Sequence, residues 1–257
     1  MSVAVILGSA FEEPTLGGHA LEPRSVQTRF GEALLHRYRR EDGLDAWVSF
    51  RHGVPHRYLP TQINYRAQAA ALEQVECDAL LATSSVGVLD PRLPLDAPLL
   101  VSDLLMPDNR LPDGTACSMF PEPQPGQWHL VLDEGIISAA LNEQVATLCQ
   151  GAGFPVAGEA LFLYAMGPRT KTAAENALWA RLGAQVNSMT VGPELVLAAE
   201  QGMPASALVV GHKYSRPGLR ERLDRETMDD TLLTGRQLMG ALALAFLLGL
   251  ALLLLRG

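Results

Sequence analysis

Cysteine is scarce in this sequence and follows no pattern. The three cysteines, Cys77, Cys117 and Cys149, are widely separated, with no CxxC pair and no neighbouring cluster of histidines. A disulfide framework needs an even set of cysteines and a zinc site needs ligands at short spacings, so neither is predicted. The pattern indicates a protein without a bound metal, in a reducing compartment such as the cytoplasm.

A basic excess is also missing. The formal net charge is −8 at pH 7, and no run of lysine or arginine interrupts the acidic balance. Nucleic-acid-binding proteins neutralise phosphates with such runs, so nucleic acid is not an expected partner. The N-terminus lacks a basic segment, and its apolar stretch from Ser2 to Leu7 runs directly into Gly8. A secretory signal is therefore not predicted.

What remains is a composition that can form a large core. The sequence has 257 residues, of which 48% are hydrophobic, which is enough for one large domain. Short apolar runs alternate with longer helical patterns, and this predicts an α/β fold in which a twisted, mixed β-sheet is flanked by helices. The predicted strands are 3–7, 47–50, 79–82, 99–101, 160–164, 184–186 and 207–210, and the predicted helices are 63–75, 134–149, 173–182 and 193–201.

Two segments depart from this alternation. The segment 106–127 is rich in proline and glycine, which predicts a long surface loop. The run 238–255 is apolar throughout and, as a helix of ~1.5 Å per residue, would nearly cross a hydrocarbon core of ~30 Å. We therefore divide the chain into a main domain, 1–235, and an apolar C-terminal helix, 236–257, for which we favour attachment to the cytoplasmic membrane face. The alternative is a terminal helix that packs in the core or in an oligomer.

Polar groups follow three of the predicted strands. Gly8-Ser9 follows the first, Arg51-His52-Gly53 follows the second, and the hydroxyl-rich segment 83–87 follows the third. Each has a structural explanation, because an arginine can pair with a carboxylate and hydroxyls can cap a helix. Together they place a cation, hydroxyls and backbone N–H groups at one sheet edge, an arrangement suited to an oxyanion such as phosphate.

These residues resemble a known family. The segment Arg51-His52-Gly53-Val54-Pro55-His56, continuing through Pro60 to Asn64-Tyr65-Arg66-Ala67, looks like the RHG and NY signature of methylthioadenosine and methylthioinosine phosphorylases. Further matches follow in the family's order: Leu7-Gly8-Ser9, the segment 83–89, Gly167-Pro168-Arg169 with Glu175, Met189-Thr190, and Pro193-Glu194. The resemblance extends from about Val3 to Tyr214.

Membership would imply a phosphorylase-type fold, usually a homotrimer, that needs no cofactor. Inorganic phosphate is the co-substrate and attacks the anomeric carbon of a purine nucleoside while the purine departs. By position, the resemblance assigns phosphate binding to Ser9, Arg51, His52, Ser85 and Thr190. It assigns ribose or base contacts to Ser84, Met189, Glu175 and Thr170.

The chain departs from the family pattern where the purine should be recognised. An Asp or Asn is expected after the strand 207–210, whereas this chain reads Gly211-His212-Lys213-Tyr214-Ser215. A gapless alignment selects Lys213 for the catalytic contact to the purine N7, and a shift of one residue selects His212. Either side chain can donate a proton. The function predicted is phosphorolysis of methylthioadenosine, methylthioinosine or a related ribonucleoside, and the alternative is a non-catalytic nucleoside-binding homologue tethered to a membrane.

Overall fold

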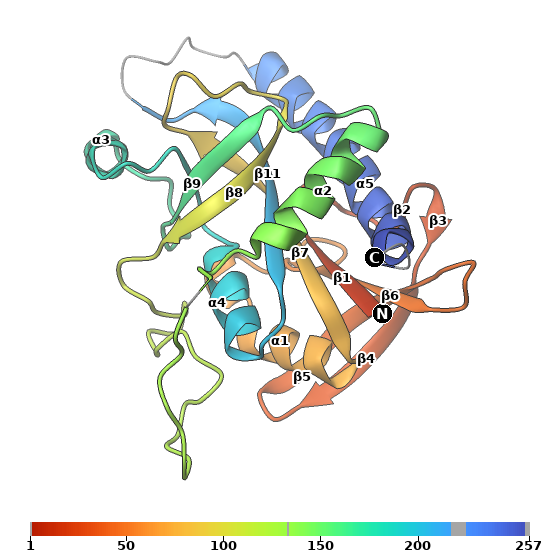
Figure 1. Ribbon diagram of the computed structural model, residues 1–257. Coiled ribbons are helices and arrows are strands. Elements are labelled where there is room, and N and C mark those ends of the chain that lie inside the picture. The colour runs from red at the N-terminus through yellow and green to blue at the C-terminus, as the bar shows by residue number, and fades with distance from the viewer. Residues whose placement is uncertain (1, 133, 217–224, 255–257) are drawn as a thin grey trace.

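The fold is built on one nine-stranded mixed sheet. The computed structural model describes residues 2–132, 134–216 and 225–254. The strand order is β10-β9-β8-β11-β7-β1-β6-β5-β4, and β2 (Thr15–Leu16) and β3 (His19–Ala20) form a small separate pair (Figure 1). The nine strands are β1 (Ser2–Leu7), β4 (Glu22–Thr28), β5 (Gly31–Arg39), β6 (Asp45–Phe50), β7 (Cys77–Val88), β8 (Pro98–Leu105), β9 (Gly158–Tyr164), β10 (Val186–Ser188) and β11 (Ala205–Tyr214).

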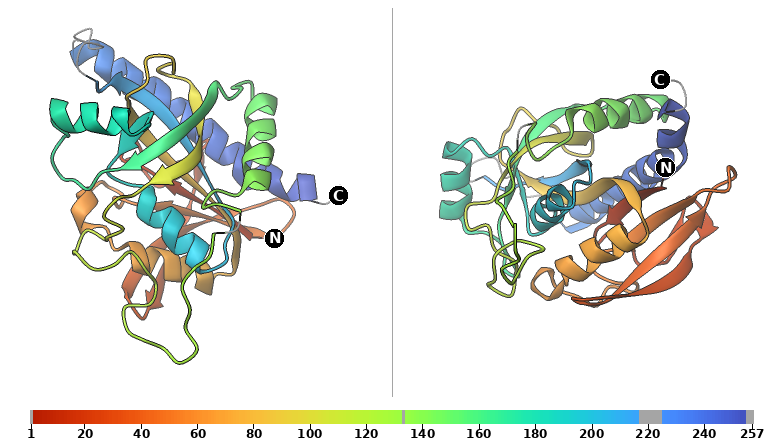
Figure 2. Two further views of the ribbon diagram at one scale, coloured as in Figure 1. Left: turned by 60° about the vertical axis from the view of Figure 1, so that its left-hand side comes forward. Right: turned by 60° about the horizontal axis from the view of Figure 1, so that its bottom comes forward.

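Helices cover both faces of this sheet (Figure 2). They are α1 (Tyr65–Gln74), α2 (Ala139–Gly151), α3 (Ala173–Arg181), α4 (Gly192–Glu200) and α5 (Arg225–Leu254), with a short 3₁₀ turn, η1 (Pro60–Gln62). The predicted α/β class and mixed sheet are therefore confirmed. The predicted helix over 134–149 starts later than expected, because Ser138 caps α2 by accepting a hydrogen bond from the Leu141 amide.

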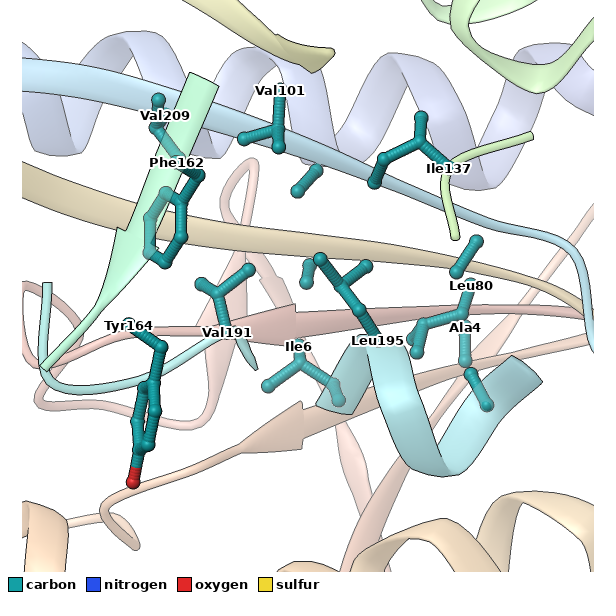
Figure 3. Close-up of a cluster of buried hydrophobic side chains, with 14 of the residues drawn as sticks. Ala4, Ile6, Leu80, Val101, Ile137, Phe162, Tyr164, Val191, Leu195 and Val209 are labelled. Atoms are coloured by element: carbon teal, nitrogen blue, oxygen red, sulfur yellow. The ribbon is translucent and has the colours of Figure 1, made fainter. Parts of the chain in front are cut away.

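The alternation of side chains along the central strands produces two cores. On β1, Ala4 and Ile6 pack on one face with α1 and α4, whereas Val3, Val5 and Leu7 pack on the other with α2 and α5. Figure 3 shows the first core, where Leu195 of α4 lies beside the β1 and β7 side chains. Burial on both faces explains why these strands read as continuous apolar runs in the sequence.

The hairpin β4–β5 was not predicted from the sequence. It forms the edge of the sheet, and β5 pairs in antiparallel register with both β4 and β6. Its exposed side chains are mostly polar or charged, and only Val26, Ala33 and Leu35 carry its contacts to the α1 side of the core. Charged residues are typical of edge strands because they discourage pairing with other chains, and here they obscured the strand pattern.

Strand β7 is longer than predicted and crosses the middle of the molecule. The hydroxyl-rich segment that was expected to follow the strand lies inside it, since β7 continues to Val88. It pairs with β1 from Cys77 to Ala82, with β11 from Leu80 to Val88 and, at Gly87 and Val88, with β10. The strand predicted at 184–186 lies instead at Val186–Ser188. Its position is set by its pairing with the end of β7 and with β9.

The predicted surface loop over 106–127 is confirmed and extends further than expected. Between β8 and α2 the described residues contain only an isolated bridge that pairs Arg110 with Ala116. Figure 1 shows the loop projecting away from the body of the molecule. Trp128, Val131 and Leu132 are among its exposed side chains.

The C-terminal helix packs on the domain. Its buried residues Leu238, Met239, Leu242, Ala243, Phe246 and Leu247 recur at three- and four-residue spacing and join the core on the α2 side of the sheet. The apolar run therefore has a covered face within the chain, which supports the alternative of a packed terminal helix. Among the described residues, no helix is both long and apolar enough to span a membrane.

Candidate active site

The first part of the site forms where β1 and β6 end side by side. These strands are parallel, with Leu7 opposite Phe50, and the Arg51 amide donates a hydrogen bond to the Leu7 carbonyl at 3.1 Å. On the other side of β1, Ile6 lies opposite Ala82 of β7. The register alone therefore brings Gly8 and Arg51 to the middle of β7, as the sequence predicted.

A cavity of about 550 Å³ opens at this edge of the sheet. It extends from the β1–β6 edge to the carboxyl end of β11, and it is lined by residues from loops more than a hundred positions apart. All but one of the predicted site residues line it: Ser9, Arg51, His52, Ser84, Ser85, Thr170, Met189, Thr190, His212 and Lys213.

Arg51 forms an ion pair within the protein, whereas the family resemblance assigned it to phosphate. Its Nε and Nη2 atoms donate to the two Glu194 carboxylate oxygens at 2.6 and 2.5 Å, and Nη1 donates to the Thr83 carbonyl at 2.7 Å. Burial alone would lower the pKa of Arg51, but Glu194 outweighs it and the pKa is raised. The guanidinium fork expected to clamp phosphate is thus directed at Glu194. A Cβ at Gly8 would lie 3.1 Å from Nη1, which explains the glycine there.

His52 is held in one tautomer. Its Nδ1 lies 2.8 Å from the Tyr58 carbonyl oxygen, which can only accept a hydrogen bond, so Nδ1 carries the proton. Burial, together with the positive charge of Arg51, lowers the pKa of His52 to about 4. At neutral pH the ring is uncharged and its Nε2 is an acceptor, which suits a hydroxyl group of phosphate or ribose.

Three hydroxyls meet between the two ends of the cavity. The Oγ of Ser84 on β7 lies 3.1 Å from the Ser188 Oγ and 3.4 Å from the Thr190 Oγ1. Thr190 immediately precedes the turn into α4, where Val191 adopts a φ of 74°. Backbone N–H groups and the dipole at a helix N-terminus favour an anion. The three hydroxyls therefore line the same cavity as Gly8 and Ser9, and α4 begins just after Thr190.

The far end of the cavity is shaped by an irregularity in β11. Gly211 pairs with Val86 and Lys213 with Gly87, so His212 is an extra residue between them. In a regular strand, neighbouring side chains point to opposite faces, whereas a bulge redirects one of them. Both His212 and Lys213 consequently line the cavity. The alignment alternatives left open by the sequence are thus both present in the site.

His212 is neutral in this environment. Burial lowers its pKa to about 4, and the positive charge of Lys213 acts in the same direction. A hydrogen bond to the Val86 backbone opposes the shift, and the buried Nδ1 has no hydrogen-bond partner among the described residues. An unpartnered buried polar atom carries a desolvation cost unless a ligand satisfies it.

Lys171 was missed by the sequence analysis. It follows Thr170 in the loop before α3 and lines the same end of the cavity as Lys213. Burial, with the charge of Lys213, lowers the pKa of Lys171 to about 8. Its position next to Gly167-Pro168-Arg169 was the available signal, but nothing in the sequence shows that this loop faces the end of β11.

The structure does not bring Glu175 to the cavity, although the resemblance assigned it a ribose or base contact. Its carboxylate accepts hydrogen bonds from Arg169 at 2.7 and 2.9 Å and from the Thr172 amide at 2.6 Å. Thr172 reciprocates by accepting from the Glu175 amide, which completes a capping box at the start of α3. Glu175 therefore fixes the loop that carries Lys171. No group of three or more metal-binding side chains occurs within residues 2–132, 134–216 and 225–254.

Comparison with known proteins places this site in a family. The sequence model of the phosphorylase superfamily matches residues 2–248, which is nearly the whole chain. The chain belongs to the phosphorylase superfamily. Among its relatives, S-methyl-5′-thioadenosine phosphorylase of Danio rerio is 28% identical over 218 residues, covering 83% of this chain and 76% of that protein.

Two further comparisons describe the range of this superfamily. A probable 6-oxopurine nucleoside phosphorylase of Moorella thermoacetica is 28% identical over 205 residues, covering 79% of this chain and 75% of that protein. The structure of methylthioadenosine phosphorylase from Schistosoma mansoni in complex with adenine superposes with a TM-score of 0.78 at 20% identity, covering 95% of this chain and 91% of that one. The fold is therefore that of the methylthioadenosine phosphorylases.

Proposed function

We propose that this phosphorylase-superfamily member is a purine nucleoside phosphorylase-type pentosyltransferase, which converts a purine nucleoside and inorganic phosphate into free purine and a ribose 1-phosphate. The observation that carries the proposal is the single cavity that joins two chemically different ends. We assign the anion site to the backbone and hydroxyl donors of Gly8, Ser9 and Thr190, and we assign proton donation to the end of the cavity at the β11 bulge, because both sets of residues line it. Membership of the superfamily and the curated relatives support the same reaction.

The anion end is suited to phosphate without an excess of charge. Because Glu194 neutralises Arg51, attraction depends on oriented donors, namely the hydroxyls of Ser9, Ser85 and Thr190, which line the cavity. His52, as an uncharged acceptor, can receive a hydrogen bond from a hydroxyl. Such preorganised dipoles stabilise a phosphate aimed at a carbon with oxocarbenium character.

The reaction balances with the groups present. A phosphate oxygen forms a bond to C1′ while the C1′–N9 bond breaks, and the electron pair of that bond moves onto the purine ring. A proton delivered to the ring makes the purine a better leaving group. Lys171, as an ammonium group at neutral pH, and Lys213 are the donors we assign to this end, and no organic cofactor or metal enters the scheme.

The proposal extends to the 5′ end of the nucleoside and to assembly. Leu59, Pro60 and Met189 contribute apolar surface to the cavity, which suits a methylthio group or an unmodified 5′ carbon. We also expect a homotrimer, as the family resemblance implies, and the exposed side chains of Trp128, Val131 and Leu132 provide apolar surface for association. Three free cysteines are consistent with a cytoplasmic protein.

The test is phosphate-dependent release of base from methylthioadenosine, methylthioinosine, inosine, xanthosine and adenosine. Thr190→Val removes one hydroxyl at nearly constant volume and should raise the KM for phosphate roughly tenfold, because a lost hydrogen bond to a charged group costs about 1.5 kcal/mol. The matched control is Thr147→Val on α2, whose hydroxyl binds only its own helix at Glu143.

Base release that does not depend on phosphate, or no release from any of the five nucleosides, would contradict the proposal. An equal rise in the KM for phosphate in the Thr147→Val control would show that the Thr190→Val effect does not come from the cavity.

A further inference from the structure

Strand β11 is bound near each end by one buried asparagine side chain. At its start, Asn142 of α2 accepts a hydrogen bond from the Ser206 hydroxyl at 2.6 Å and donates to the Val101 carbonyl at 3.0 Å. Just past its end, Asn176 of α3 donates to the Ser215 carbonyl at 2.8 Å. Both asparagines are buried, and a buried amide is costly unless its hydrogen bonds are made, so each pairing is a specific feature of the fold.

The two ends of β11 differ in what lies next to them. Asn176 and Ser215 line the active-site cavity, whereas Asn142 and Ser206 are not among its described lining residues. Ser215 comes two residues after Lys213, which lines the same end of the cavity. The pairing of Asn176 with Ser215 therefore fixes backbone that belongs to the base end of the cavity, and the pairing of Asn142 with Ser206 does not.

A second asparagine completes the pairing at the cavity end of β11. Asn187 of β10 is also buried and also lines the cavity, and its Nδ2 donates to the Asn176 Oδ1 at 3.0 Å. That bond occupies the acceptor of the Asn176 amide and so directs its NH2 group toward the Ser215 carbonyl. Two consecutive hydrogen bonds, from Asn187 to Asn176 and from Asn176 to Ser215, thus connect β10, α3 and the end of β11. We call them the asparagine relay.

The close approach of these groups depends on Gly87 of β7. Gly87 pairs with Asn187 on one side and with Lys213 on the other. A Cβ at Gly87 would lie 3.2 Å from the Asn187 Oδ1 and would overlap the Ser215 hydroxyl. The Ser215 amide in turn donates to the Val88 carbonyl at 2.8 Å. The residue that follows β11 is therefore fixed by β7 through its amide and by the asparagine relay through its carbonyl.

We propose that Asn176 and Asn187 are positioning residues for the nucleoside, because the asparagine relay sets the place of the β11 end against the bound base. This inference rests on the proposed phosphorolysis and adds two residues that the family resemblance did not assign. Asn187 acts through Asn176, and Asn176 acts through the Ser215 backbone. The phosphate end of the cavity, at Ser9 and Thr190, should not depend on the relay.

Steady-state kinetics of Asn176→Leu, an apolar replacement of similar size, test the relay with the nucleoside that is turned over best among the five named above. The KM for the nucleoside should rise about tenfold, the effect of one lost hydrogen bond, while the KM for phosphate should change little. Asn142→Leu is the matched control, because it removes the buried asparagine at the other end of β11. It should also lower stability, but it should leave both KM values unchanged.

The relay also predicts that the two asparagines do not act independently. Asn187→Val removes the donor to Asn176, and valine suits a strand position. It should raise the KM for the nucleoside by less than Asn176→Leu does, since the bond to Ser215 can still form. The double variant should match Asn176→Leu alone, because Asn187 acts only through Asn176. If Asn176→Leu does not fold, Asn187→Val tests the relay through the difference between its two KM values.

Two measurements need no turnover. Calorimetric binding of adenine and hypoxanthine should weaken about tenfold in Asn176→Leu, for the same lost hydrogen bond, and should not change in Asn142→Leu. Hydrogen exchange of the peptide that contains Ser215 should be faster in Asn176→Leu than in the wild-type protein, because the amide bonded to Val88 opens more readily.

The outcomes separate the relay from the reaction. Absence of phosphate-dependent base release by the wild-type protein would overturn the proposed function, whereas weaker base binding in Asn176→Leu but not in Asn142→Leu would still support the relay. Equal rises in the two KM values, an equal rise in the control, or additive effects in the double variant would overturn the relay even if the enzyme is active.

Discussion

The two ends of the cavity use positive charge in opposite ways. At the phosphate end, Arg51 is fully buried and its charge is neutralised by Glu194. At the base end, Lys171 and Lys213 face the cavity with no acidic residue among its described lining residues. The first end is therefore an overall neutral frame that presents dipoles, whereas the second end contains Lys171 and Lys213, the two lysines of the sequence. The recognisable family motif therefore belongs to the frame, and we assign substrate choice to the less recognisable end.

The largest expected effect is on the frame itself. Arg51→Met leaves Glu194 buried without its partner and should reduce the free energy of unfolding by about 3–5 kcal/mol. Replacing both residues, with Arg51→Met and Glu194→Leu, should cost less than the single change because no uncompensated charge remains. Urea unfolding of the single and double variants measures the difference.

The exposed pair of Arg39 with Glu22 provides the control for this experiment. Removing one partner there, with Arg39→Met, should leave stability nearly unchanged, because solvent screens exposed charges. If the double variant is less stable than Arg51→Met, the pair does not act as an electrostatic unit.

An intermediate effect is expected from pH, and it should appear at the base end. Lys171 is protonated below its pKa of about 8 and loses its charge as pH rises through that value. The KM for an oxopurine nucleoside should therefore rise roughly tenfold above pH 8, the difference between a charged and a neutral hydrogen bond. The KM for phosphate should show no step at that pH, since neither His52, with a pKa of about 4, nor Arg51 titrates there.

The profile of Lys171→Met is the reference for this measurement. It should lack the step near pH 8 in the KM for the nucleoside. A step that persists in Lys171→Met would assign the titration to another group.

The smallest expected effect comes from removing the N-cap side chains of two helices, one of which follows the loop at the base end of the cavity. Thr172→Ala and Ser138→Ala each remove an N-cap side chain, from α3 and α2 respectively. Each should cost about 1 kcal/mol of stability. Only Thr172→Ala should also raise the KM for the nucleoside, because the cap of α3 fixes the loop that carries Lys171. Steady-state kinetics and thermal unfolding of the two variants decide this. Equal KM values in both would show that the position of Lys171 does not depend on the cap.

The sequence predicted the parts of the site that depend on strand ends. Residues directly after β1 and β6 were expected to meet, and they do, because parallel neighbours end at the same edge of the sheet. The central strands were found because burial on both faces produces continuous apolar runs. The edge hairpin β4–β5 was missed because its charged, exposed residues have weak apolar alternation.

Contacts between distant segments could not be predicted in this way. Arg51 and Glu194 are separated by 143 positions, and the pairing of a motif arginine with a motif glutamate is set by how α4 packs on the sheet. The bulge at His212 depends on pairing with β7, and the place of Lys171 depends on where the α3 loop crosses the end of β11. The C-terminal run was apolar enough to suggest a membrane, but its helical spacing also fits the buried face observed on the domain.

Strand β7 contacts both ends of the cavity within a few residues. Its Thr83 carbonyl accepts the hydrogen bond from Arg51, and its Val86 backbone holds His212. These two positions are three residues apart, which in an extended strand is a distance of ~10 Å. Because β7 pairs with β11 at each position from Thr83 to Val86, that separation is set by the sheet. Strand β7 should therefore fix the distance between the phosphate end and the base end of the cavity, and so limit the length of the substrate that fits.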